Sequence, residues 1–150
     1  MSAEESLKRI FEEINEKGRA HLYTKGISMR PLLKEKRDIS VLVPPERALR
    51  RGDVVLYIRR DQLVLHRIVK VNTDGSFLIR GDNTFSDETV NRDDIKAILE
   101  AIYRKGRYID CEKSFFYRFY SSVWTAIYPI RKFFRIAVRQ RLAKFKNSLK

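Results

Sequence analysis

The sequence predicts a small, mainly β domain with a short helix before it and a helical tail after it. Three observations carry this prediction: apolar runs of strand length separated by turn residues, a helical repeat at the start of the chain, and an abrupt change of composition after Cys111. At 150 residues the chain has the size of one ordinary domain. We therefore expect one mostly antiparallel β domain at residues 19–113, an N-terminal helix at 1–18 and a tail at 114–150.

The first segment has the pattern of an amphipathic helix. Ser2 and Glu5 match a capping box, and apolar residues then recur with helical spacing from Leu7 until Gly18. The opening M-S-A-E-E-S is acidic where a secretory signal would be basic, and no apolar run follows it. We therefore expect a docked helix and neither a signal peptide nor a membrane span at this end.

The middle of the chain alternates between strand and turn signals. Runs rich in Val, Ile, Leu and Tyr predict strands at about 20–25, 39–43, 53–58, 63–71, 76–80, 97–103 and 107–111. The clearest hairpin joins 63–71 to 76–80 around N-T-D-G. This spacing is typical of a mostly antiparallel sheet.

The tail carries most of the net charge of +13. Residues 114–150 hold nine Lys and Arg and no Asp or Glu, whereas residues 1–113 hold 23 basic and 19 acidic residues. The tail is helical in period, is interrupted at Pro129, and contains ten of the seventeen aromatic residues. Its uncharged run at 119–130 is shorter than the roughly 20 residues that span a bilayer.

A cationic, aromatic-rich helix favours attachment to an anionic membrane surface. We therefore expect a cytoplasmic protein that is peripheral at the inner face of the membrane. The alternative is that the aromatic stripe packs on the protein's own sheet. Nucleic acid ranks lower as a partner, because no recognisable binding module accompanies the basic segment.

One serine lies in a sequence context in which its hydroxyl could act as a nucleophile. Ser28 lies in K-G-I-S-M-R-P-L-L, directly after a predicted strand. A serine close to a proline usually marks only a turn, and its hydroxyl needs a neighbouring base to become a nucleophile. The histidines are His21 and His66, and a histidine in a strand such as L-V-L-H-R-I-V-K-V is often structural. Downstream, Asp82 and Asp87 in R-G-D-N-T-F-S-D could bring a carboxylate to the imidazole.

Taken in order, G-x-S-M-x-P-x-L, R-G-D-V-V, H-R-I-V and G-D-N with a further Asp resemble the type I signal peptidases over about residues 20–111. The resemblance is to their Ser-His branch, found in archaea and the endoplasmic reticulum, because His66 stands where the bacterial branch has lysine. It implies a coiled β fold of the signal peptidase and LexA-like type. It also implies a serine endopeptidase without metal or cofactor, in which Ser28 is the nucleophile and His66 the general base.

The resemblance implies that the third catalytic residue is an acid about six residues after Asp82. Asp87 lies five residues on and Glu88 six; we choose Asp87, with Asp82 as the alternative that more readily holds its own loop. The resemblance further implies cleavage of an extended precursor or leader peptide after small residues, bound by strand addition. The expected substrate-binding residues, which surround the serine, are Gly26, Ile27, Met29 and Pro31. An imidazole with its ordinary pKa near 6.5 would make activity fall through about pH 6 to 7.

The chain departs from the family at Gly26-Ile27, where the usual motif begins Ser-Gly, and at Arg30, where the Ser-His branch often has glutamate. Two other functions stay open. One is a catalytically silent relative that binds a membrane or a partner. The other is a LexA-like regulatory peptidase, which would need a lysine base, a DNA-binding domain and an Ala-Gly or Cys-Gly cleavage site; neither dipeptide occurs here.

Overall fold

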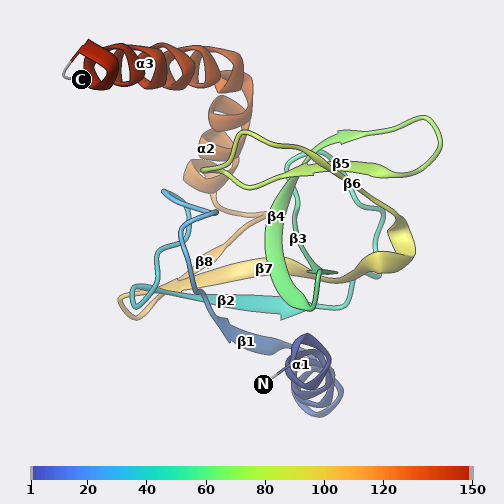
Figure 1. Cartoon of the computed structure of the whole chain (residues 1–150). Coiled ribbons are helices and arrows are strands. Elements are labelled where there is room, and N and C mark those ends of the chain that lie inside the picture. The colour runs from blue at the N-terminus through green and yellow to red at the C-terminus, as the bar shows by residue number, and fades with distance from the viewer. Residues whose placement is uncertain (1, 149–150) are drawn as a thin grey trace.

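The computed structural model describes residues 2–148 and contains one eight-stranded antiparallel sheet, one helix before it and two helices after it (Figure 1). The strands are β1 (Ala20–Tyr23), β2 (Asp38–Val43), β3 (Val54–Arg59), β4 (Gln62–Val71), β5 (Phe77–Arg80), β6 (Glu88–Val90), β7 (Ile95–Arg104) and β8 (Arg107–Asp110), and the 3-10 helix η1 (Arg92–Asp94) precedes β7. The seven predicted strands are confirmed, and so is the antiparallel pairing of β4 with β5. The short strand β6 was not predicted.

The sheet has the strand order β1-β2-β7-β3-β4-β5-β6, and β8 pairs with the end of β7. The buried apolar residues form two clusters, and the second is built almost entirely from residues of the strands themselves. Along β3, Val54 and Leu56 belong to one cluster, while Val55 and Tyr57 belong to the other. Side chains of a strand point alternately to opposite faces, so this strand supplies both cores.

The helix α1 (Ala3–Lys17) begins with the predicted capping box of Ser2 and Glu5. It ends at Gly18, which adopts the left-handed conformation with φ of 74° and donates its N–H to the carbonyl of Ile14. Ile10 and Ile14 are buried in the first apolar cluster. The helix therefore docks beside β1 and β4, at the end of the molecule opposite to the C-terminal helix (Figure 1).

The tail forms two helices, α2 (Phe115–Ala126) and α3 (Tyr128–Ser148). Ser114 caps α2 by accepting a hydrogen bond from the N–H of Tyr117, and Pro129 lies in the first turn of α3, where proline is tolerated. Figure 1 shows α2 standing on the β domain and α3 projecting away from it. Within residues 2–148, no helix combines the length and the apolar character that a bilayer span requires.

Candidate active site

His66 lies in the middle of β4 and is only 3% exposed. Its Nδ1 is 3.1 Å from the hydroxyl of Tyr57, and that hydroxyl donates to Oε2 of Glu88 at 3.0 Å. Because the tyrosine has one hydroxyl proton and gives it to Glu88, its oxygen accepts the proton on Nδ1. Glu88 is in turn paired with Arg59. This series of hydrogen bonds assigns the proton of the neutral imidazole to Nδ1. The other ring nitrogen, Nε2, is then the acceptor.

The other ring nitrogen, Nε2, is buried and has no hydrogen-bond partner among the described residues. Gly81 lies against it: a Cβ built on this glycine would be 2.9 Å from Nε2 and 2.7 Å from the backbone oxygen of Ser28. Ser28 and His66 are therefore close neighbours, although they come from the loop after β1 and from β4. A side chain at position 81 would intrude between them.

The turn that contains Ser28 is held by the loop at residues 81–83. The backbone oxygen of Ser28 accepts the N–H of Asn83 at 2.8 Å, and the oxygen of Ile27 accepts the Asn83 side-chain amide at 3.1 Å. The N–H of Asp82 points at Sδ of Met29 at 3.5 Å. The Ser28 hydroxyl does not hydrogen bond to Nε2 of His66 in this structure. Catalytic hydrogen bonds are often long in ligand-free sites and tighten when substrate binds.

Burial lowers the pKa of His66 from 6.5 to about 4. The negative charges of Glu88 and Asp82 oppose this decrease, and the positive charge of Arg59 adds to it. The imidazole is therefore neutral throughout the physiological pH range and can accept a proton. The prediction that activity falls through about pH 6 to 7 assumed an imidazole with its ordinary pKa. Burial lowers the pKa of His66, so the acid limb that we expect lies nearer pH 4.

The two aspartates chosen from the sequence lie in different settings. Asp82 is buried and receives hydrogen bonds from Nε and Nη2 of Arg67, both at 2.8 Å, and from the hydroxyl of Tyr120 at 2.9 Å. Asp87 is more exposed and pairs with Arg80. Neither carboxylate hydrogen bonds to His66. The acidic residue that the structure connects to the imidazole is Glu88, through Tyr57.

A groove of about 720 Å³ passes Ser28, whereas His66 is not among the residues that line it. It is lined by α1, by β1 with the start of the following loop, and by the first half of β4; Ser28 and Met29 belong to its wall. Of the four expected substrate-binding residues, Met29 lines this groove, whereas Gly26, Ile27 and Pro31 do not. Met29 is also buried in the core, so it supports the wall more than it offers a surface.

Two strand edges border this groove. In the described sheet, β1 pairs only with β2, and β4 begins to pair with β5 only at Arg67. Residues 20–23 and 62–66 therefore each have an edge without a neighbouring strand. On the edge of β1, the backbone N–H of His21 already donates to Oε2 of Glu13 at 3.3 Å. A peptide in extended conformation could hydrogen bond to the remaining positions of the two edges.

Sequence reasoning missed Tyr57 and Gly81. It noted Glu88 as the sixth residue after Asp82, in the segment that carries the resemblance, but chose Asp87. Tyr57 had no signal, because it lies within an ordinary apolar strand. Among residues 2–148, no group of three or more His, Cys, Asp or Glu side chains is arranged to hold a metal ion.

Comparisons of the chain with protein-family models, with curated proteins and with solved structures find no match.

Proposed function

We propose that the chain is a serine endopeptidase that is similar to the type I signal peptidases of the Ser-His type. The main support is the neutral, buried His66, whose free Nε2 lies beside the turn that carries Ser28. A buried polar atom without a partner is uncommon and costs free energy, and a catalytic role is one explanation for it. The antiparallel sheet and the order of the motifs along it also support a fold of the signal peptidase and LexA-like type.

In the proposed reaction, Oγ of Ser28 attacks the carbonyl carbon of a peptide bond, and Nε2 of His66 takes the hydroxyl proton. Backbone N–H groups, including that of Ser28, stabilise the oxyanion of the tetrahedral intermediate. The carbon–nitrogen bond then breaks, and the imidazolium gives its proton to the leaving amine. A water molecule attacks the acyl-enzyme ester while His66 accepts its proton. Oγ leaves as the ester bond breaks, recovers that proton, and the acyl product departs as a carboxylic acid.

Tyr57 and Glu88 act as positioning residues in this proposal. The hydroxyl oxygen of Tyr57 accepts the Nδ1 proton and so keeps the ring in the tautomer that presents Nε2. The charge of Glu88 raises the pKa of His66 against the effect of burial, which favours the imidazolium that forms during proton transfer. In this proposal Tyr57 and Glu88 together orient the imidazole, which is the role that the sequence prediction gave to Asp87 or Asp82.

The proposed substrate is a precursor or leader peptide in extended conformation. The groove supports this, because two strand edges without neighbours line it and Ser28 lies in its wall. Cleavage after small residues is carried over from the resemblance. As part of the same proposal, the enzyme works at the cytoplasmic face of a membrane.

A peptide library tests the peptidase proposal. We expect the full chain to generate new peptide termini, detected by mass spectrometry, and the Ser28→Ala variant to generate none of them. The matched control is Ser122→Ala, which removes an exposed hydroxyl from α2 and should leave cleavage unchanged. Cleavage that survives in Ser28→Ala would overturn the proposal, and absence of cleavage by every form would favour a catalytically silent relative.

A further inference from the structure

The helix α2 has two faces of opposite character. Its inner face contacts the β domain: Tyr117 and Ser121 are buried, and Trp124 donates its indole N–H to the backbone oxygen of Asp82 at 2.8 Å. Its outer face carries Phe115, Phe116, Phe119 and Val123, which are all exposed, and Phe116 reaches 82%. An aromatic patch of this kind on the surface of a domain marks a contact site.

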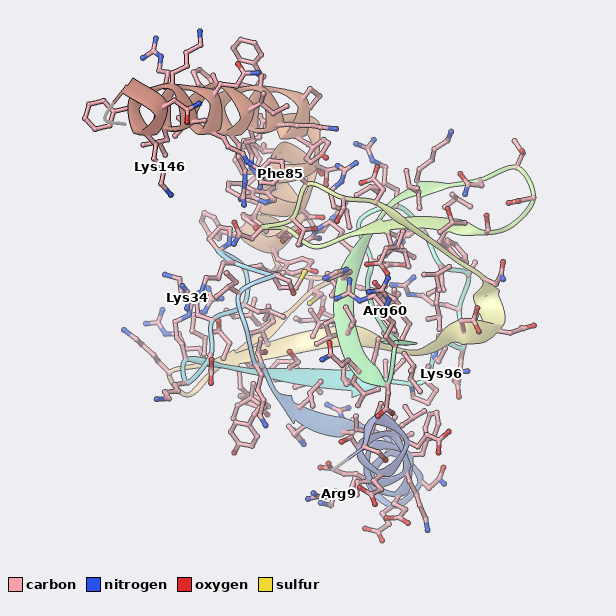
Figure 2. The ribbon with its side chains drawn as sticks, in the orientation of Figure 1. Arg9, Lys34, Arg60, Phe85, Lys96 and Lys146 are labelled. Carbon is pink, nitrogen blue, oxygen red and sulfur yellow. The ribbon has the colours of Figure 1, made fainter. Side chains whose placement is uncertain are left out.

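The helix α3 extends this surface and adds positive charge. Phe133 and Phe134 are exposed, at 68% and 62%, and further apolar side chains follow along the helix. Near its start, Arg131 lies over the ring of Trp124 at 3.8 Å and Arg135 over that of Phe85 at 4.6 Å. Figure 2 shows Phe85 at this junction between the β domain and the two helices. The rest of α3 projects with its cations exposed.

We infer that α2 and α3 together form a docking arm for an anionic lipid bilayer. The outer face of α2 and the apolar side chains of α3 enter the headgroup region, and the cations lie among the lipid phosphates. Charge complementarity selects this partner, because residues 114–150 contain nine Lys and Arg and no acid. Long cationic side chains can lie beside apolar ones at a bilayer surface, since their charged ends reach the phosphates while their stems stay apolar.

Other partners fit this surface less well. The core of a protein–protein interface is depleted of lysine, whereas here cations alternate with apolar side chains along the whole of α3. Duplex nucleic acid would make use of the cations, but not of the outer face of α2, which is aromatic and whose helix has Arg118 as its one charged residue. The inference concerns this arm alone and does not depend on peptidase activity.

Vesicle sedimentation tests the docking. We expect the full chain to bind vesicles of phosphatidylcholine with about 30% phosphatidylglycerol at least tenfold more strongly than vesicles of phosphatidylcholine alone, and salt to weaken this binding. Replacing Phe115, Phe116 and Phe119 together by Ser should reduce binding at least tenfold. The charge variant Arg139→Glu, Arg141→Glu should abolish the preference for anionic lipid. Its matched control, Lys8→Glu, Lys70→Glu, makes the same charge change on the β domain and α1.

A fluorescence experiment tests the proposed orientation. Trp124 is the single tryptophan and lies on the inner face of α2. Its emission should stay unchanged when anionic vesicles are added. A tryptophan placed on the outer face, Phe119→Trp in a Trp124→Phe background, should shift to the blue and be quenched by brominated lipid.

Three results would overturn the inference. The first is equal binding to neutral and anionic vesicles by all variants. The second is quenching of Trp124 with no response from the outer-face reporter. The third is the absence of vesicle binding, whether or not the chain self-associates or binds duplex DNA through the same helices.

Discussion

Two neighbouring residues of β4, His66 and Arg67, are both buried but have opposite hydrogen-bonding states. Arg67 is 1% exposed, and its guanidinium donates to both oxygens of Asp82, to the backbone oxygen of Gly52 and to the hydroxyl of Ser121. His66 has one ring nitrogen bound to Tyr57 and the other without a partner. Because successive side chains of a strand point to opposite faces, His66 and Arg67 lie in two different environments although they are adjacent in the chain.

The two residues differ in what their hydrogen-bonding state allows them to do. A fully paired buried ion pair holds elements together, and here Arg67 ties the loop at 81–83 and α2 to the sheet. A buried imidazole with a free nitrogen is available to accept a proton. The sequence H-R therefore contains one residue that fixes the site and one that we propose to work in it.

The largest expected effect is on activity and comes from His66. In the His66→Gln variant, the specificity constant for peptide cleavage should fall at least about a thousandfold, because the proposed general base is lost. The free energy of unfolding at neutral pH should fall by no more than about 1.5 kcal/mol, the value of one hydrogen bond. Steady-state kinetics and urea unfolding measure the two quantities. Unchanged kinetics would remove His66 from the mechanism.

The opposite pattern is expected for Asp82. The Asp82→Asn variant leaves the Arg67 guanidinium buried and without its ion partner, which should cost about 3–5 kcal/mol of unfolding free energy. Asp87→Asn is the control, since the more exposed pair with Arg80 should be worth less than about 1 kcal/mol. Urea unfolding compares the two. Equal losses would show that the Arg67 ion pair contributes no more than a surface pair.

Protonation of His66 should appear in the stability of the protein. The unfolded chain binds this proton near pH 6.5 and the folded protein only near pH 4, so stability is full above pH 6.5 and decreases between these values. The total loss from this group is about 3 kcal/mol. Because carboxylates titrate in the same range, the measurement is the difference between the native protein and His66→Gln. A difference that is flat from pH 7 to pH 4 would contradict the lowered pKa.

The smallest effect is expected from the positioning residues. Glu88→Gln removes a charge that raises the pKa of His66, so the acid limb of the activity profile should move to lower pH and the rate should fall about tenfold. Asp87→Asn should leave both unchanged, since this carboxylate binds Arg80. A rate loss without movement of the acid limb would indicate a merely structural role for Glu88. The same change in both variants would mean that Glu88 has no special connection to His66.

Much of the fold could be predicted because its signals are local. The capping box of Ser2, the strand runs and the N-T-D-G turn each lie within a few residues of the chain. The strand β6 was missed because its three residues, Glu88–Val90, are too few to show an alternation. Its pairing with β5 depends on tertiary contacts that no short pattern reports.

The proposed nucleophile and base could be found from motifs, but their surroundings could not. Tyr57 reaches His66 because β3 and β4 pair with Val55 opposite His66, which puts the tyrosine on the diagonal position of the same face. The choice between Asp87 and Glu88 depends on a single residue of register, since neighbouring side chains of an extended segment point in opposite directions. The pKa of His66 depends on burial, which sequence spacing does not give.

The loop at residues 81–83 has a mechanical consequence. On one side Asn83 grips the turn of Ser28, and on the other the backbone oxygen of Asp82 is held by Trp124 and by Arg131, at 2.5 Å. The two C-terminal helices are therefore connected to the turn of Ser28 by only a few hydrogen bonds and covalent bonds. This connection does not pass through either apolar core. A partner that displaced these two helices would therefore act on the backbone of the Ser28 turn through the loop at 81–83.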